Sequence, residues 1–240
     1  MLIPLYDHNP VDKLPIVTYV IIGLNVLVWL FIQHAGFGEG YQASLCNLAL
    51  IPGDLLNNTE FAGRQMQNGY VCFFGEPHNF ETLITHMFMH GGWLHLIGNM
   101  WFLWIFGDNI ENALGKIKFI LFYLLCGVVA AGFQIVSDMN SLIPMVGASG
   151  AVSGVMGAYI LLHPRARIKS LLFFVIFITV IEVPAVIILG MYIATQVFSV
   201  VMLADGPVAF WAHVGGFVCG ALIIKLLKPK ETTFKLRIER

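Results

Sequence analysis

The sequence has few charged residues: they make up 11% of its 240 amino acids, while hydrophobic residues make up 58%. Soluble domains carry roughly 25% charged residues, and a surface that faces water cannot be built from so few. The formal net charge of −1 and the lack of a basic stripe argue against a nucleic-acid-binding protein. With a mean hydropathy of +0.81, the chain is predicted to lie in a lipid bilayer.

Six apolar segments are long enough to cross a membrane as helices, which takes about 20 mostly apolar residues. Their apolar character is continuous rather than strictly alternating, which favours helices over a barrel. The predicted fold is therefore an all-α, polytopic membrane protein. Its six spanning helices are expected at roughly 16–32, 83–106, 117–136, 145–162, 184–203 and 208–227.

The basic residues indicate how these helices are oriented. With the N-terminus inside, twelve of the thirteen Lys and Arg residues fall on the inner side and only Arg64 lies outside, as the positive-inside rule expects. The apolar segment 171–181 is too short to cross as a helix, and a crossing there would move the basic tail outside. We therefore interpret it as an interfacial or re-entrant segment that leads into the fifth helix.

This topology divides the chain into a cytoplasmic N-terminal segment (1–15), a six-helix domain (16–228) and a basic cytoplasmic tail (229–240). It also predicts a multi-pass protein of the cell membrane, with both termini in the cytoplasm. We find no internal repeat and no second domain.

One connection is long, the first outer loop at about 36–81. It contains Cys46 and Cys72, which an oxidising compartment would allow to form a disulfide; the sequence leaves this open. Its aromatic residues either dip into the outer leaflet or pack within the loop, and the sequence does not decide between the two. These aromatic residues are Phe61, Tyr70, Phe73 and Phe74.

Strongly polar side chains are costly inside membrane spans and indicate function by default. Three predicted spans carry them at one level, in the outer half of the bilayer: Ser149 in the fourth, His213 in the sixth, and His95 with Asn99 in the second. Each has an ordinary alternative, because small residues around Ser149 would pack helices and the other groups could bond across helices. At matched depth, however, they fit one chemistry better than three unrelated packing features.

That chemistry is acyl transfer by a serine nucleophile. A neutral hydroxyl needs a base within hydrogen-bond reach, and His213 is the candidate base for Ser149. Ser149 is expected at the start of a helix, where free N–H groups and the helix dipole favour negative charge. Its N–H and the side chains of Asn99 and His95 would hold an oxyanion. No carboxylate is well placed to complete a catalytic triad, so a Ser–His dyad is predicted.

At these residues the sequence resembles the rhomboid family of intramembrane serine proteases. The resemblance extends over about 16–227 and includes the order of the six spans. Any one of the family's motifs is weak evidence by itself, but all of them in this order are highly specific for the family. They are HGGWLHLIGN at 90–99, GDNIE at 107–111, GASG at 147–150 and AHVGGFVCG at 212–220.

The resemblance implies Ser149 as nucleophile, His213 as general base, and His95 and Asn99 as oxyanion-hole side chains. It further implies that the substrate is a membrane-spanning helix of another protein, cut near its outer end through an acyl-enzyme. The active site should then open to the extracytoplasmic side. No metal, small-molecule cofactor or nucleic acid is expected.

Two motif residues, His90 and Glu111, match positions that are structural in the family. The chain departs from the family at Ser153, four positions after the nucleophile, where many relatives carry an aromatic residue that packs against the catalytic imidazole. The orientation of His213 is therefore expected to depend on other contacts.

Other functions fit the sequence less well. A rhomboid-like protein without activity would bind or escort membrane helices, but several such relatives lack the serine or the histidine, and both are present here. A transporter or channel tends to place acids or broken helices at the bilayer midplane. A zinc protease would show His-Glu-x-x-His in a span, and an aspartyl protease needs two intramembrane aspartates; the predicted spans contain neither.

Overall fold

Most of the chain is helical in the structure, a computed structural model that describes residues 2–11, 13–56, 64–65, 71–72, 79–174, 177–202 and 208–227. The predicted predominance of helix is confirmed. The helices are α1 (Ile16–Leu27, continued by a π-helical turn, Val28–Ile32), α2 (Gly38–Leu48), α3 (Pro52–Leu55), α4 (Thr82–Thr85), α5 (Trp93–Leu114), α6 (Lys116–Ser137), α7 (Ser149–Leu162), α8 (Ala185–Val201) and α9 (Phe210–Leu226).

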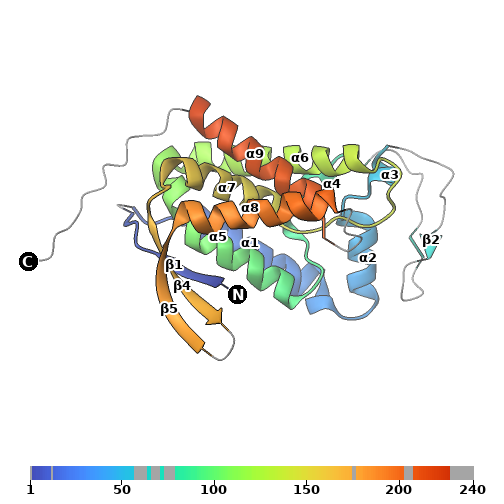
Figure 1. The fold of residues 1–240 in the computed structure, drawn as a ribbon. Coiled ribbons are helices and arrows are strands. Elements are labelled where there is room, and N and C mark those ends of the chain that lie inside the picture. The colour runs from blue at the N-terminus through green and yellow to red at the C-terminus, as the bar shows by residue number, and fades with distance from the viewer. Residues whose placement is uncertain are drawn as a thin grey trace, which may run out of the picture.

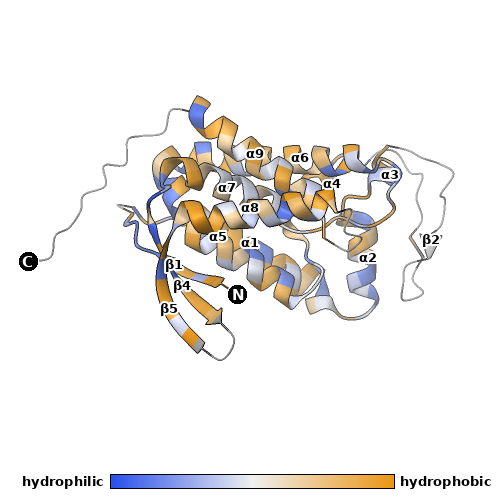
Figure 2. Ribbon diagram, viewed as in Figure 1, coloured by the Kyte–Doolittle hydropathy of each residue, from blue (hydrophilic) through white to orange (hydrophobic). Residues whose placement is uncertain are grey.

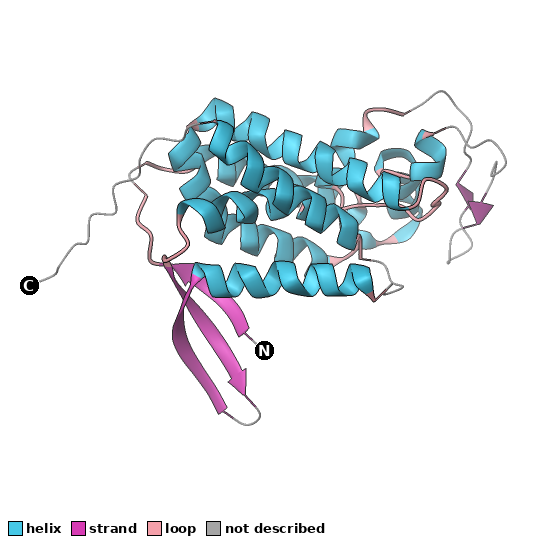
Figure 3. Cartoon of the chain, turned by 45° about the horizontal axis from the view of Figure 1, so that its top comes forward, coloured by secondary structure: helices cyan, strands magenta, loops and turns pink. Residues whose placement is uncertain are grey.

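Helix α7 forms the centre of the bundle: residues 150–159 are all buried, and the helix packs against α5, α6, α8 and α9. Figure 3 shows the helices gathered in one bundle, from which strands project at one end. Glycines bring α7 and α9 into backbone contact. A methyl group added at Gly216 would collide with the carbonyl oxygen of Gly150, and one at Gly220 with that of Gly154. This close packing of small residues places the start of α9 beside the start of α7.

Between Phe119 and Phe133, helix α6 carries apolar side chains on every side. It buries residues such as Phe119 and Cys126 against the bundle, while Ile117, Leu121 and Val136 on its outer face are 63–76% exposed. A continuous exposed apolar stripe of this kind is typical of a surface that contacts lipid or another apolar partner. Figure 2 shows the apolar character of the helices, with hydrophilic segments at α2 and near the base of the sheet.

Five of the six predicted spanning segments coincide with helices to within a few residues: α1 with its π-helical turn, α6, α7, α8 and α9. Among the residues that the structure describes, α6 alone is both long and apolar enough to cross a membrane by itself. The apolar helices at 16–32, 149–162, 185–201 and 210–226 are shorter. The number of six crossings therefore stays a prediction.

The second predicted segment differs most. It is not one helix from 83 to 106, because α4 is followed by a 3₁₀ turn (His86–Phe88) that ends at Phe88, and α5 begins only at Trp93. Helix α5 then extends to Leu114, eight residues past the predicted end. The interruption at His90 lies just before the first turns of α5, and it shapes the wall of the candidate site.

The prediction of an all-α chain is wrong at one end of the bundle, where a three-stranded antiparallel sheet projects (Figure 1). Strands β4 (Arg167–Phe174) and β5 (Phe177–Pro184) form a hairpin, and β1 (Leu2–Asp7) adds to the outer side of β4. The apolar segment 171–181 therefore lies in a hairpin. It is rich in β-branched and aromatic residues, which favour strands, and Leu171 pairs with Val180 across it.

The long outer loop carries structure of its own, α2, α3 and the short strands β2 (Arg64–Gln65) and β3 (Val71–Cys72). Cys46 and Cys72 form a disulfide, with their Cα atoms 5.5 Å apart, which answers the question that the sequence left open. The aromatic residues Phe61, Tyr70, Phe73 and Phe74 and the basic tail at 229–240 lie outside the described residues.

Candidate active site

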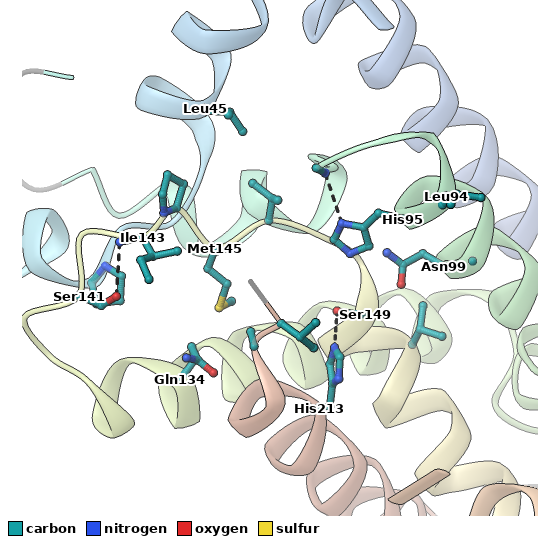
Figure 4. Close-up of a pocket in the computed structure, with 18 of the residues that line it drawn as sticks. Leu45, Leu94, His95, Asn99, Gln134, Ser141, Ile143, Met145, Ser149 and His213 are labelled. Atoms are coloured by element: carbon teal, nitrogen blue, oxygen red, sulfur yellow. Dashed lines mark hydrogen bonds between the residues drawn. The ribbon is translucent and has the colours of Figure 1, made fainter. Parts of the chain in front are cut away.

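Ser149 and His213 meet where α7 and α9 begin. Ser149 is the first residue of α7, and His213 lies in the first turn of α9. Their side chains are hydrogen-bonded, with 2.8 Å between Ser149 Oγ and His213 Nε2 (Figure 4). The two helices touch through glycine, so a short serine side chain reaches the imidazole. This is the geometry that a histidine base needs to take a proton from a hydroxyl.

The second nitrogen of His213 also has a partner, which the sequence analysis missed. Nδ1 of His213 lies 2.7 Å from Oε1 of Gln196 on α8. A carboxamide oxygen can only accept, so Nδ1 carries the proton and Nε2 presents a lone pair to Ser149. No ion pair links His213 to a carboxylate in the described part of the chain. The one feature of the sequence that could have indicated Gln196 was a polar amide inside an apolar segment.

Tyr192, one turn before Gln196 on α8, supplies an aromatic ring beside His213. The two ring centroids are 6.4 Å apart and the planes are inclined by 37°. The Tyr192 hydroxyl is hydrogen-bonded to Ser153 Oγ at 2.6 Å. Ser153 thus holds, through its hydroxyl, a ring that comes from another helix. This agrees with the expectation that other contacts orient His213.

Two side-chain donors converge beside Ser149. His95 and Asn99 share a face of α5, and Nδ1 of His95 accepts the Gly91 N–H at 3.3 Å, which leaves Nε2 as the N–H donor. Asn99 Nδ2 is buried and has no hydrogen-bond partner among the described residues. A methyl group at Gly147 would lie 2.7 Å from His95 Nε2 and 3.5 Å from Asn99 Nδ2. Both donors therefore face the backbone just before Ser149.

The chain around these donors is held by a reciprocal pair of hydrogen bonds. Gln33 donates from Nε2 to the carbonyl of His90 at 2.8 Å, and its Oε1 accepts the N–H of His90 at 2.7 Å. These two bonds satisfy the N–H and C=O groups of His90, which have no helical partner because the chain is not helical between Phe88 and Trp93. The His90 ring lies edge-on to His95, with the centroids 5.2 Å apart. Gln33 therefore holds His90, and the His90 ring in turn packs against His95.

A cavity of about 1130 Å³ opens over Ser149 and His213, lined mainly by apolar side chains (Figure 4). Its walls come from α2 (Leu45), the loop before α7 (Met145) and α8 (Tyr192). Because α2 and α3 lie at the end of the bundle away from the sheet (Figure 1), the cavity is at that end. All four sequence-predicted site residues line it. The arrangement places the Ser149 hydroxyl beside an imidazole nitrogen that can accept its proton, with two N–H donors on the same cavity.

Comparison with known proteins adds a family. Residues 77–230 match the model of the rhomboid domain. The chain is 29% identical over 166 residues to Rhomboid-like protein 11, chloroplastic, of Arabidopsis thaliana, which covers 62% of this chain and 54% of that protein. It is 32% identical over 151 residues to Rhomboid protein 1, mitochondrial, of Saccharomyces cerevisiae, covering 59% and 40%.

A bacterial relative gives a similar match. Identity to Rhomboid protease GluP of Bacillus subtilis is 29% over 153 residues, which is 63% of this chain and 26% of that protein. The chain thus spans about half or less of the length of these three relatives.

Proposed function

The chain belongs to the rhomboid family, whose model matches more than half of it, and from this premise we propose that it is an intramembrane serine protease working through a Ser149–His213 dyad. Members of the family are membrane proteins and generally intramembrane serine proteases, although some rhomboid-like proteins are inactive. The observation that carries the proposal is the 2.8 Å hydrogen bond between Ser149 Oγ and His213 Nε2.

In the proposed mechanism, Ser149 Oγ attacks the carbonyl carbon of the scissile peptide bond while His213 Nε2 takes the hydroxyl proton. His213 then gives that proton to the departing amine, which leaves an acyl-enzyme on Ser149. A water molecule, activated by the same imidazole, attacks the ester and releases the new carboxyl end. The cavity open above Ser149 supplies a route for this water.

The oxyanion of each tetrahedral intermediate would be held by Asn99 Nδ2 and His95 Nε2, together with the Ser149 N–H. The first N–H groups of a helix have no intrahelical partner, and the helix dipole there favours negative charge. The absence of a partner for Asn99 Nδ2 among the described residues supports this role, because a buried donor without a partner is costly to keep. A donor of this kind contributes about 2.7–4 kcal/mol to transition-state stabilisation.

The proposed substrates are membrane-spanning helices of other proteins, cut near the outer face. Carbonyls in a regular helix are hydrogen-bonded, so the cut segment must unwind, which Gly or Pro near the bond would ease. The Cys46–Cys72 disulfide borders the cavity end of the bundle and supports an oxidising environment there. Together with the charge distribution, this favours six crossings of the cell membrane, both termini in the cytoplasm, and a site open to the outside.

The purified protein in liposomes, mixed with a single-span substrate protein, tests this function. We expect one cut near the outer end of the substrate helix and no cleavage by Ser149→Ala. A fluorophosphonate probe should label the wild type on Ser149 and fail to label His213→Ala. Full activity of Ser149→Ala would show the dyad assignment to be wrong. Binding of the substrate helix without any cleavage would point to an inactive, helix-binding relative.

A further inference from the structure

We propose that Gln196 is the positioning residue of the general base: it selects the tautomer of His213 and, with Tyr192, fixes the imidazole to helix α8. This inference rests on the proposed function and deepens it, because it adds a positioning residue to the Ser149–His213 dyad. Gln196 does not contact the reacting atoms in this scheme. It acts through His213.

The direction of the Gln196 amide follows from a chain of hydrogen bonds along α8. Thr195 Oγ1 uses its hydrogen to donate to the carbonyl of Tyr192 at 2.6 Å, so towards Gln196 it can only accept. Gln196 Nε2 donates to this oxygen at 3.4 Å. The NH₂ group of the amide therefore points to Thr195, and Oε1 points to His213, 2.7 Å from Nδ1.

An acceptor at Nδ1 decides whether His213 can act as a base. Neutral imidazole carries one N–H, on either nitrogen. With the hydrogen on Nε2, the ring could not take the proton of Ser149; with the hydrogen on Nδ1, it can. Gln196 Oε1 stabilises the second form, and its bond strengthens when the ring becomes an imidazolium, since hydrogen bonds from charged donors are stronger than neutral ones. In serine proteases with a triad, a carboxylate fills this position.

The face of α8 that carries Gln196 also holds the ring from a second side. Residues four apart lie on one face of a helix, so Tyr192 and Gln196 both point at α9. Tyr192 lies against His213 and against Phe217, one turn further along α9, with ring centroids 6.4 and 6.5 Å apart. The base is thus positioned by α8, whereas the nucleophile is positioned by α7. A shift of α8 would release both contacts at once.

A purely structural role makes a different prediction. If Gln196 merely fills space, a side chain of similar shape without the amide oxygen should serve equally well. If Gln196 positions His213, the acceptor matters and the shape alone does not. Gln196→Met keeps the length of the side chain and removes the amide oxygen. Gln196→Glu keeps a side-chain oxygen that can accept the hydrogen bond from His213 Nδ1.

The experiment measures kcat and KM for a single-span substrate in liposomes. We expect Gln196→Met to lower kcat about ten-fold with little change in KM, the size expected for one hydrogen bond to a group that becomes charged. Gln196→Glu should stay within about three-fold of the wild-type kcat. Labelling of Ser149 by a fluorophosphonate should slow by the same factor in Gln196→Met, because that reaction also needs the base. Val197→Ala, the neighbouring residue on the exposed side of α8, should behave as wild type.

The outcomes separate the two proposals. Thermal unfolding identifies a variant that does not fold, and Gln196→Leu then replaces Gln196→Met. Wild-type kcat in the folded variant without the amide oxygen, or an equal loss of kcat in that variant and in Gln196→Glu, overturns the role of Gln196 and leaves the dyad intact. An inactive wild type, or an active Ser149→Ala variant, overturns the proposed function itself.

Discussion

Asp7, the last residue of strand β1, accepts a hydrogen bond from the Tyr159 hydroxyl of α7, the helix that begins at Ser149. The same carboxylate oxygen accepts a second bond, from Asn109 Nδ2 on α5 at 2.9 Å. The N-terminal strand is thus fastened to two helices of the bundle, at the end opposite to the candidate active site. These bonds and the pairing of β1 with β4 hold the N-terminal strand at this end of the bundle.

The docking of β1 should depend on pH. Burial, with a smaller contribution from the neighbouring Asp108 carboxylate, raises the pKa of Asp7 to about 7, whereas an unfolded aspartate titrates near 3.9. The folded state therefore binds the proton more tightly. The stability that this proton contributes is complete below about pH 4 and is lost as the pH rises towards about 7. The full effect is on the order of 4 kcal/mol.

Thermal unfolding of the wild type and of Asp7→Asn, followed between pH 4 and pH 8, tests this dependence. The asparagine cannot ionise, so the wild type should lose stability relative to the variant as the pH increases. Both proteins share all other titrating groups, and the difference between them isolates Asp7. Parallel pH curves for the two proteins would contradict the prediction.

The extent of the helices was largely readable from the length of apolar runs. Helix α6 was expected at 117–136 and spans Lys116–Ser137. The break before α5 was not readable, because hydropathy ignores the backbone and the bonds that satisfy it come from Gln33, 57 residues away. The hairpin was missed for a related reason: a short apolar run fits a strand or a buried helix, and its partner β1 lies at the other end of the chain.

More of the candidate site than of the fold around it could be predicted from the sequence. Ser149, His213, His95 and Asn99 stand out because polar groups in an apolar segment need a reason, and the structure places all four around one cavity. Gln196 carries the same signal, but its meaning depends on which face of α8 meets α9. That pairing is set by tertiary packing, so it could not be derived from spacing along the sequence.

Glu111 should be a large contributor to stability. This buried carboxylate on α5 accepts the N–H groups of Val17 and Thr18 at 3.0 and 2.8 Å and the Thr18 hydroxyl at 2.9 Å. It therefore caps the first turn of α1 from a helix that is far away along the sequence. We expect Glu111→Ala to lower the free energy of unfolding by about 3 kcal/mol and Glu111→Gln, which keeps one acceptor oxygen, to lower it less. Equal unfolding temperatures for wild type and Glu111→Ala would contradict this role.

The Cys46–Cys72 disulfide should stabilise the wall of the cavity. It closes a loop with a sequence separation of 26 residues and ties α2, whose Leu45 lines the cavity, to β3. Reduction should lower the free energy of unfolding by about 3 kcal/mol. The control is the double variant Cys46→Ser/Cys72→Ser. Its remaining cysteines, Cys126 and Cys219, are free thiols, so a reductant should leave its unfolding temperature unchanged. A reductant that shifts neither protein would show that the disulfide contributes nothing.

Asn99 should separate activity from stability. Its Nδ2 is buried without a partner among the described residues, so removing it takes away a cost to the resting protein rather than a bond. In the transition state the same donor would meet the oxyanion. Asn99→Ala should therefore lower kcat by about 100- to 1000-fold while the unfolding temperature stays the same or rises.

The matched control is Asn25→Ala. The Asn25 side chain in α1 is also buried, and its Oδ1 has no partner among the described residues, but its Nδ2 donates to the carbonyl of Ile21 at 2.8 Å. This substitution should lower the unfolding temperature and leave kcat unchanged, which is the opposite pattern. A large loss of stability in Asn99→Ala, with activity falling only in proportion to the folded fraction, would mean that Asn99 is a structural amide. The oxyanion would then have to be held by His95 Nε2 and the backbone N–H of Ser149 alone.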